Sequence, residues 1–213
     1  AIHHPIVYQS VSWMGQSLPR LDKATNLMQQ PVVHGGKIFW LGKERQATLP
    51  PTLHWIPTDG GGDAKGLPGL KLDSNYFGTM SRLAISPAGD YAYMTFSRTC
   101  VMWGHKDAKH EHVVYRARVD GKTGIEAFLG TRKKPGSDNA HFSEAAAVAC
   151  DTKGRVYVCD KMNNRVQVFT AEGKHAKTVP VKRPLLAQVH PKDDSLYVLH
   201  FASVRGKVTP RLT

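Results

Sequence analysis

Residues that can bind a metal are densest between positions 105 and 112, where the sequence reads HKDAKHEH. His110 and His112 are two residues apart, so in a strand both side chains lie on one face. Imidazole nitrogens at this spacing can bind a divalent transition metal, and His105 or Asp107 can complete its coordination shell. The alternative is a polar insertion between two strands, because the neighbouring lysines would repel a cation.

A second group of polar residues lies in the stretch CDKMNNRVQVF, at positions 159–169. Asp160, Asn163 and Asn164 have short polar side chains that hydrogen-bond the local backbone and tolerate positive φ. Between two strand-like runs these properties favour a tight turn, after which Arg165 begins the next strand. We therefore interpret the four residues as a structural turn rather than as a ligand site.

The chain carries 29 Lys and Arg against 17 Asp and Glu, a formal net charge of +12. This balance favours anionic partners such as nucleic acid, polysaccharide, lipid head groups or an acidic protein. The basic residues are spread along the chain, with short clusters at positions 131–134 and 182–183. A solvated basic surface is therefore favoured over a dedicated nucleic-acid site.

The three cysteines, Cys100, Cys150 and Cys159, show no spacing typical of a zinc ribbon or of covalently bound haem. Cys150 and Cys159 lie in adjoining strand-like runs, where they can either pair or remain as buried free thiols. No run approaches the roughly 20 apolar residues of a membrane-spanning helix, so no transmembrane segment is expected.

Short strands and turns dominate the sequence and predict an all-β fold. A helix is indicated weakly, over Phe142–Cys150. The predicted strands are rich in Val, Tyr and Phe and are bounded by Gly, Asp, Asn and Pro. They are Lys37–Leu41, Tyr91–Phe96, Val113–Val119, Arg155–Cys159, Arg165–Phe169 and Ser195–His200.

Several of these runs share a longer frame of strand, polar turn and strand. It occurs at residues 31–40, 83–93, 148–157 and 188–197, with an aromatic residue in the second strand. Successive aromatic positions, from Phe39 through Tyr93 and Tyr157 to Tyr197, are 54, 64 and 40 residues apart. A unit of about 40 to 50 residues built from four short strands is typical of a propeller blade. In such a blade Val166 and Val168 would face one neighbour, and Gln167 and Phe169 the other.

The segment 142–169, FSEAAAVACDTKGRVYVCDKMNNRVQVF, closely resembles an NHL repeat. The pattern of that family runs from a phenylalanine through V-A-x-D and G-x-V-Y-V-x-D to N-x-R-V-Q-V-F. The resemblance implies a β-propeller of four-stranded blades, of which about four are visible here. Propellers of this kind typically close with six blades, so we expect the chain to be part of a longer propeller. Residues 1–30 are then an N-terminal extension or closing strand, and residues 31–213 hold the blades.

Enzymes that resemble NHL propellers suggest which positions to inspect. Lyases that cleave peptidyl-hydroxyglycine place metal-binding histidines at the start of the inner strands, and the corresponding positions here are Ser81, Ala146 and Leu186. Because none is histidine, that chemistry is not supported. Calcium-dependent lactonases need several converging carboxylates, which Glu144 alone does not supply. The candidate ligand-binding residues at the inner-strand entries are therefore Ser81, Arg82 and Glu144.

Two classes of function remain. The first is a propeller binding or scaffold module that recognises a protein, a glycan or another anionic partner through its loop-rich faces. The second is the propeller part of an extracytoplasmic enzyme, of redox, hydrolase or lyase type, with its site at the axial channel. RNA binding, which the resemblance also allows, is a variant of the first and ranks third because the charge is dispersed. The resemblance implies a secreted or periplasmic location.

Overall fold

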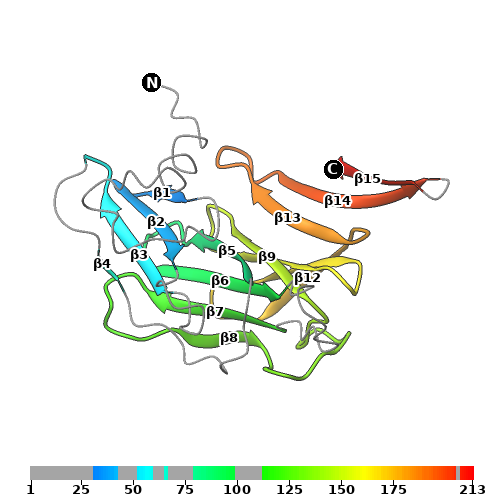
Figure 1. The fold of residues 1–213 in the computed structure, drawn as a ribbon, viewed down its shortest axis with the longest axis horizontal. Helices are drawn as coiled ribbons and strands as arrows, with labels where there is room; N and C mark the ends of the chain where they lie inside the picture. Colours follow the sequence, from blue (N-terminus) through cyan, green and yellow to red (C-terminus); the bar gives the residue numbers. More distant parts are fainter. Residues whose placement is uncertain (1–30, 43–51, 60–64, 67–78, 99–111, 205–206) are drawn as a thin grey trace, which may run out of the picture. The chain divides into compact units, whose positions relative to one another are not determined.

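The structure, a computed structural model, describes residues 31–42, 52–59, 65–66, 79–98, 112–204 and 207–213. Within these residues every regular element is a β-strand, and no helix long and apolar enough to cross a membrane is found. The chain divides into two compact units, Ala1–Phe77 and Gly78–Thr213 (Figure 1). The prediction of an all-β fold is confirmed.

The first unit contains one four-stranded antiparallel sheet in the order β1-β2-β3-β4. Its core is made of apolar residues from the two central strands, among them Phe39, Leu41 and Leu53, which are buried. The four strands are β1 (Val32–His34), β2 (Lys37–Gly42), β3 (Thr52–Pro57) and β4 (Lys65–Gly66).

The second unit contains three antiparallel sheets, each formed by strands that are consecutive in the chain. The first sheet consists of β5 (Thr79–Ile85), β6 (Tyr91–Arg98), β7 (Val113–Arg118) and β8 (Glu126–Gly130). The second consists of β9 (Ala145–Cys150), β10 (Val156–Asp160), β11 (Arg165–Phe169) and β12 (His175–Pro180). The third has three strands, β13 (Pro184–Val189), β14 (Leu196–Val204) and β15 (Lys207–Leu212).

The four repeats found in the sequence correspond to the first two strands of the four sheets. All six predicted strands are confirmed, with ends that differ from the prediction by at most four residues. The helix indicated at Phe142–Cys150 is wrong, because Ala145–Cys150 forms the strand β9, which pairs with β10 along its length. Its alanines have high helix propensity, but their small side chains also allow neighbouring sheets to pack closely on both faces of a strand.

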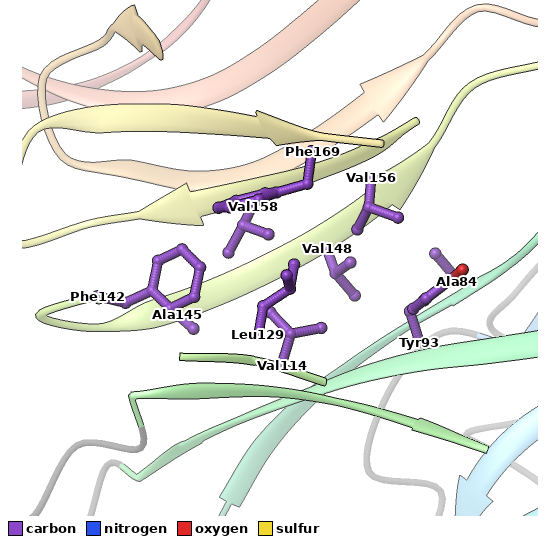
Figure 2. Packing of buried hydrophobic residues seen from close by; sticks show 10 residues of the cluster. All are labelled: Ala84, Tyr93, Val114, Leu129, Phe142, Ala145, Val148, Val156, Val158 and Phe169. Carbon is purple, nitrogen blue, oxygen red and sulfur yellow. The ribbon is translucent and has the colours of Figure 1, made fainter. Parts of the chain in front are cut away.

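The β9–β12 sheet is packed on both faces within the second unit. Figure 2 shows one face, where Val156, Val158 and Phe169 lie with Phe142 near Val114 and other residues of the β5–β8 sheet. Residues that alternate with these, including Val166 and Val168, pack with Ala187 and Val198 of the third sheet. The alternation predicted for β11 is thus observed, and a single small sheet buries both of its faces only by having two neighbours.

The third sheet has a row of leucines on the face opposite to Ala187 and Val198. Leu186 pairs with Leu199, and Leu199 pairs with Leu212, so the three residues share one face. Leu186 and Leu212 are exposed, as is Tyr197 in the neighbouring row. A six-bladed ring, which would need further blades, stays a prediction.

The two described cysteines are free thiols on opposite faces of one sheet. Cys150 packs toward the β5–β8 sheet and Cys159 toward the third sheet, so the pairing left open by the sequence does not occur. Burial raises the pKa of each thiol to about 12. At neutral pH both groups are therefore protonated and poorly nucleophilic.

We expect both thiols to resist modification in the folded protein. In a Cys100→Ser variant, which leaves only these two, a disulfide reagent at pH 8 should react about a thousandfold more slowly than with an ordinary thiol. After denaturation without a reductant, two thiols should be titrated. Rapid modification of the native protein, or no free thiol after denaturation, would contradict the burial and the lack of pairing.

Candidate functional site

The turn between β10 and β11 lies at the end of the second sheet where β9 begins. Asp160, the last residue of β10, pairs with Arg165, the first of β11, and is also opposite Ala145 at the start of β9. Asn164 closes the turn with φ of 55°, in the left-handed region. Asparagine adopts this conformation at lower cost than most residues because its short amide can bond locally.

The carboxylate of Asp160 is completely buried and organises the turn. Its Oδ2 accepts hydrogen bonds from Asn163 Nδ2 and from Arg165 Nε, both at 2.8 Å. Its Oδ1 accepts one from the backbone N–H of Ser143 at 2.9 Å, just before β9. A buried charge is tolerated only when it is paired and hydrogen-bonded in this way.

The same turn holds the loop that connects β8 to β9. Asn163 Nδ2 also donates to the carbonyl of Gly136 at 2.7 Å. Arg165 donates from its two terminal nitrogens to the carbonyls of Ser137 and Asp138, both at 2.7 Å, and more weakly to that of His141. The guanidinium therefore fixes the loop through backbone atoms.

The turn also holds the connection from β12 to β13. The carbonyl of Asn164 accepts a hydrogen bond from the N–H of Val181 at 3.1 Å. Its side-chain oxygen accepts one from the N–H of Arg183 at 3.0 Å. Two loops that are separated by the whole β9–β12 sheet in sequence are thus attached to one turn.

Glu144 lies beside this turn and is engaged in an ion pair. Lys161 Nζ is 2.9 and 3.0 Å from the two carboxylate oxygens, and the Lys161 N–H donates to the Glu144 carbonyl. Glu144 is almost fully buried, while Lys161 is partly exposed. The carboxylate of Glu144, which the sequence suggested as a binding residue, is therefore paired with a lysine of the protein itself.

These contacts join the turn and the two loops into one basic surface, which we call the basic loop cluster. It consists of residues 131–144, 160–165 and 181–183, and it contains seven Lys and Arg against three Asp and Glu. Two of the three acids, Asp160 and Glu144, are buried in ion pairs. Lys134, Lys182 and Arg183 are exposed, and among the described residues they have no ion-pair partner.

The third acid of the basic loop cluster is held by a histidine. His141 Nδ1 lies 2.9 Å from both carboxylate oxygens of Asp138, and this hydrogen bond lowers the pKa of the Asp138 carboxyl. The pair links two residues of the loop that connects β8 to β9. Each acid of the cluster thus has a partner within the protein.

The turns at the other end of the sheets have a different charge. Residues 86–90, 119–125, 151–155, 170–174 and 190–195 contain five Lys and Arg against six Asp and Glu. Here Asp194 joins two neighbouring sheets, because its Oδ1 accepts the Thr152 hydroxyl at 2.8 Å. This hydrogen bond lowers the pKa of Asp194, whose other oxygen lies near Lys153 and Arg155.

Asp151, in the same end of the second sheet, forms a second network. Its carboxylate accepts the N–H groups of Lys153 and Arg155, each at 2.9 Å, and pairs with the Arg155 guanidinium. Tyr157 donates its hydroxyl to this carboxylate, and burial is the main cause that raises the pKa of Tyr157 to about 12. These groups stabilise the turns, and the net charge of the turns at this end is only −1.

The remaining predicted site residues lie on several elements of the chain. Ser81 and Arg82 lie in β5, whereas Glu144 precedes β9. His112 precedes β7, and His105, Asp107 and His110 lie outside the described residues. In the described part of the chain, no group of three His, Cys, Asp or Glu side chains is placed to hold a metal ion.

Comparison with known proteins agrees with the repeat and the fold. Residues 142–169 match the NHL repeat family. No curated protein sequence matches the chain. Solved structures with similar folds include regucalcin, a calcium-binding protein from Agrobacterium tumefaciens, with 16% identity and a TM-score of 0.51. Others are a gluconolactonase from Xanthomonas campestris (14%, 0.51) and hydrazine synthase from Kuenenia stuttgartiensis (13%, 0.52).

These matches define the class of protein. The three cover 80%, 80% and 84% of this chain but only 52%, 54% and 56% of their own chains, so this chain spans about half their length. At such low identity the likeness concerns the fold alone. The chain is a β-propeller protein that contains an NHL repeat.

The left-handed residue of the turn offers a direct test. Asn164→Val places a β-branched side chain at positive φ and should lower the free energy of unfolding by about 1–2 kcal/mol beyond the loss in Asn164→Gly. Both variants lose the bond to Arg183, so their difference isolates the backbone conformation. Denaturant unfolding of the two proteins measures it, and equal stabilities would contradict the assigned turn.

Proposed function

We propose that this chain is a binding module whose basic loop cluster recognises an anionic partner. The observation that carries the proposal is the charge difference between the two ends of the sheets. At one end two basic loops are hydrogen-bonded to the Asp160–Arg165 turn, and at the other acids slightly outnumber bases. A concentrated field of one sign raises the rate of association with an oppositely charged partner.

The pairing of the acids within the basic loop cluster supports the proposal. The carboxylates of Asp160 and Glu144 are neutralised by Arg165 and Lys161. They are therefore not available to Lys134, Lys182 and Arg183, which are exposed and can meet a ligand. These three cations follow or precede residues that are fixed by backbone hydrogen bonds, so little backbone ordering is needed on binding.

An enzymatic function lacks a comparable observation. The carboxylate of Glu144, the acidic candidate at an inner-strand entry, is held at short distance by Lys161. The likeness to a gluconolactonase and to hydrazine synthase concerns the fold. Binding at a loop-rich face therefore ranks first, and a secreted or periplasmic location is proposed with it on the sequence resemblance.

Matched charge reversals test the proposal. The triple variant Lys134→Glu, Lys182→Glu and Arg183→Glu changes the basic loop cluster, and Lys122→Glu, Lys174→Glu and Lys192→Glu changes the opposite turns by the same net charge. With immobilised heparin as a generic polyanion, the first variant should elute at much lower salt than the wild type, and the second at nearly the same salt.

Far-ultraviolet circular dichroism and thermal unfolding establish that both triple variants are folded. If the two variants lower the elution salt equally, binding follows net charge and no dedicated face exists. If neither lowers it, the basic loop cluster is not the site. Either result overturns the proposed function.

A further inference from the structure

An exposed methionine lies within the basic loop cluster. Met162 is 50% exposed and follows Lys161 in the turn that holds both basic loops. The other large exposed hydrophobic residues of the described chain lie on β1, β13, β14 and β15. Met162 is therefore the large exposed apolar side chain of the basic loop cluster, where a solvent-facing turn would be expected to carry a polar residue.

The position of Met162 is defined by its neighbours in the turn. Asn163 is bonded to Gly136 of one basic loop, and Asn164 is bonded to Arg183 of the other. The methionine thus stands at a junction between Lys134, two residues before Gly136, and the pair Lys182 and Arg183. An apolar centre with a charged rim is the usual anatomy of a protein interface, in which Met and Arg are enriched.

The aromatic residues of the basic loop cluster do not suit a nucleic acid. Its ring-bearing residues are His141 and Phe142, of which Phe142 is buried and His141 has a side chain only 17% exposed. Proteins that bind single strands stack unpaired bases on exposed aromatic rings. A methionine surrounded by cations is better matched by a polypeptide that carries both acidic and apolar side chains.

Backbone conformation supplies an independent observation. Four non-glycine residues of the described chain have positive φ, and three belong to the basic loop cluster: Lys133 at 59°, Asn164 at 55° and Arg183 at 48°. Asparagine tolerates this region, but lysine and arginine do so at greater cost. Glycine would remove that cost at Arg183, so the presence of a long cation there indicates a role for its side chain.

We propose that the basic loop cluster binds an acidic polypeptide segment of a partner protein. An apolar side chain of the segment packs on Met162, and its carboxylates pair with Lys134, Lys182 and Arg183. Arg183 can bind a carboxylate with two parallel hydrogen bonds, which a lysine cannot do. This inference rests on the proposed function and adds to it the chemical class of the partner.

The test uses two short fluorescent peptides of Glu and Asp, one with two central leucines and the other with serines in their place. At about 0.15 M salt, the whole chain should bind the leucine peptide about tenfold more tightly than the serine peptide. Met162→Ala should abolish this difference. The matched control Leu212→Ala, at an exposed leucine outside the basic loop cluster, should leave the difference intact.

The outcomes separate this inference from the proposed function. If the Lys134, Lys182 and Arg183 reversal weakens heparin binding but the two peptides bind equally, the function stands and the polypeptide partner is wrong. Tighter binding of single-stranded RNA than of the leucine peptide at the same salt also overturns it. If the reversal changes neither heparin nor peptide binding, both proposals fail.

Arg183→Gly gives a second readout. If the arginine serves binding, relief of the positive φ should keep or raise the melting temperature, while the affinity for the leucine peptide falls about tenfold. An arginine kept for stability would show the opposite, a lower melting temperature with unchanged peptide affinity. That second result would remove Arg183 from the proposed interface.

Discussion

The buried carboxylate of Asp160 is the interaction on which the organisation of the basic loop cluster depends. It has no exposed surface, and it accepts hydrogen bonds from the start of β9, from Asn163 and from Arg165. Removing one partner of such a buried pair typically costs about 3–5 kcal/mol, because the other charge is left uncompensated. Asp160 and Arg165 therefore constrain each other, and Arg165 extends the constraint to the loop before β9.

At both ends of the sheets in the second unit, acidic side chains pair with groups of the protein, but the two ends differ in net charge. At the end where β9 begins, buried acids anchor internal cations, and Lys134, Lys182 and Arg183 remain at the surface. At the other end, Asp151 and Asp194 pair with nearby cations and hydroxyl groups, and the turns carry little net charge. Of the overall charge of +12, the basic loop cluster carries a net +4, from seven bases and three acids, and the opposite turns carry a net −1, from five bases and six acids.

Much of the fold could be predicted from local pattern. The second blade of the second unit, with the strands Val156–Asp160 and Arg165–Phe169, combines alternation, β-branched residues and polar turns, and its repeat is confirmed. Strands such as His175–Pro180 carry charged and proline residues because they lie at an exposed sheet edge, where packing does not impose an apolar pattern. The helix indicated at Phe142–Cys150 failed because the packing of small residues between two sheets outweighs alanine's intrinsic preference.

The candidate site was harder to predict from the sequence than the fold. Both basic clusters, at 131–134 and 182–183, are visible in the sequence, but about 50 residues separate them. Their meeting depends on the carbonyls of Gly136 and Ser137 and on the Arg183 N–H, and backbone groups leave no mark on residue type. The turn that joins them can be predicted from the sequence, but the backbone groups that it binds are known only from the three-dimensional fold.

One turn fixes two loops that are distant in sequence as a single surface. Hydrogen–deuterium exchange of Asp160→Asn tests it most directly, because the variant replaces an acceptor carboxylate by an amide of equal size. Exchange should accelerate in residues 136–143 and in residues 181–183, while β6 and β7 keep their protection. Unchanged exchange in both loops, in a variant that remains folded by circular dichroism, would contradict the account.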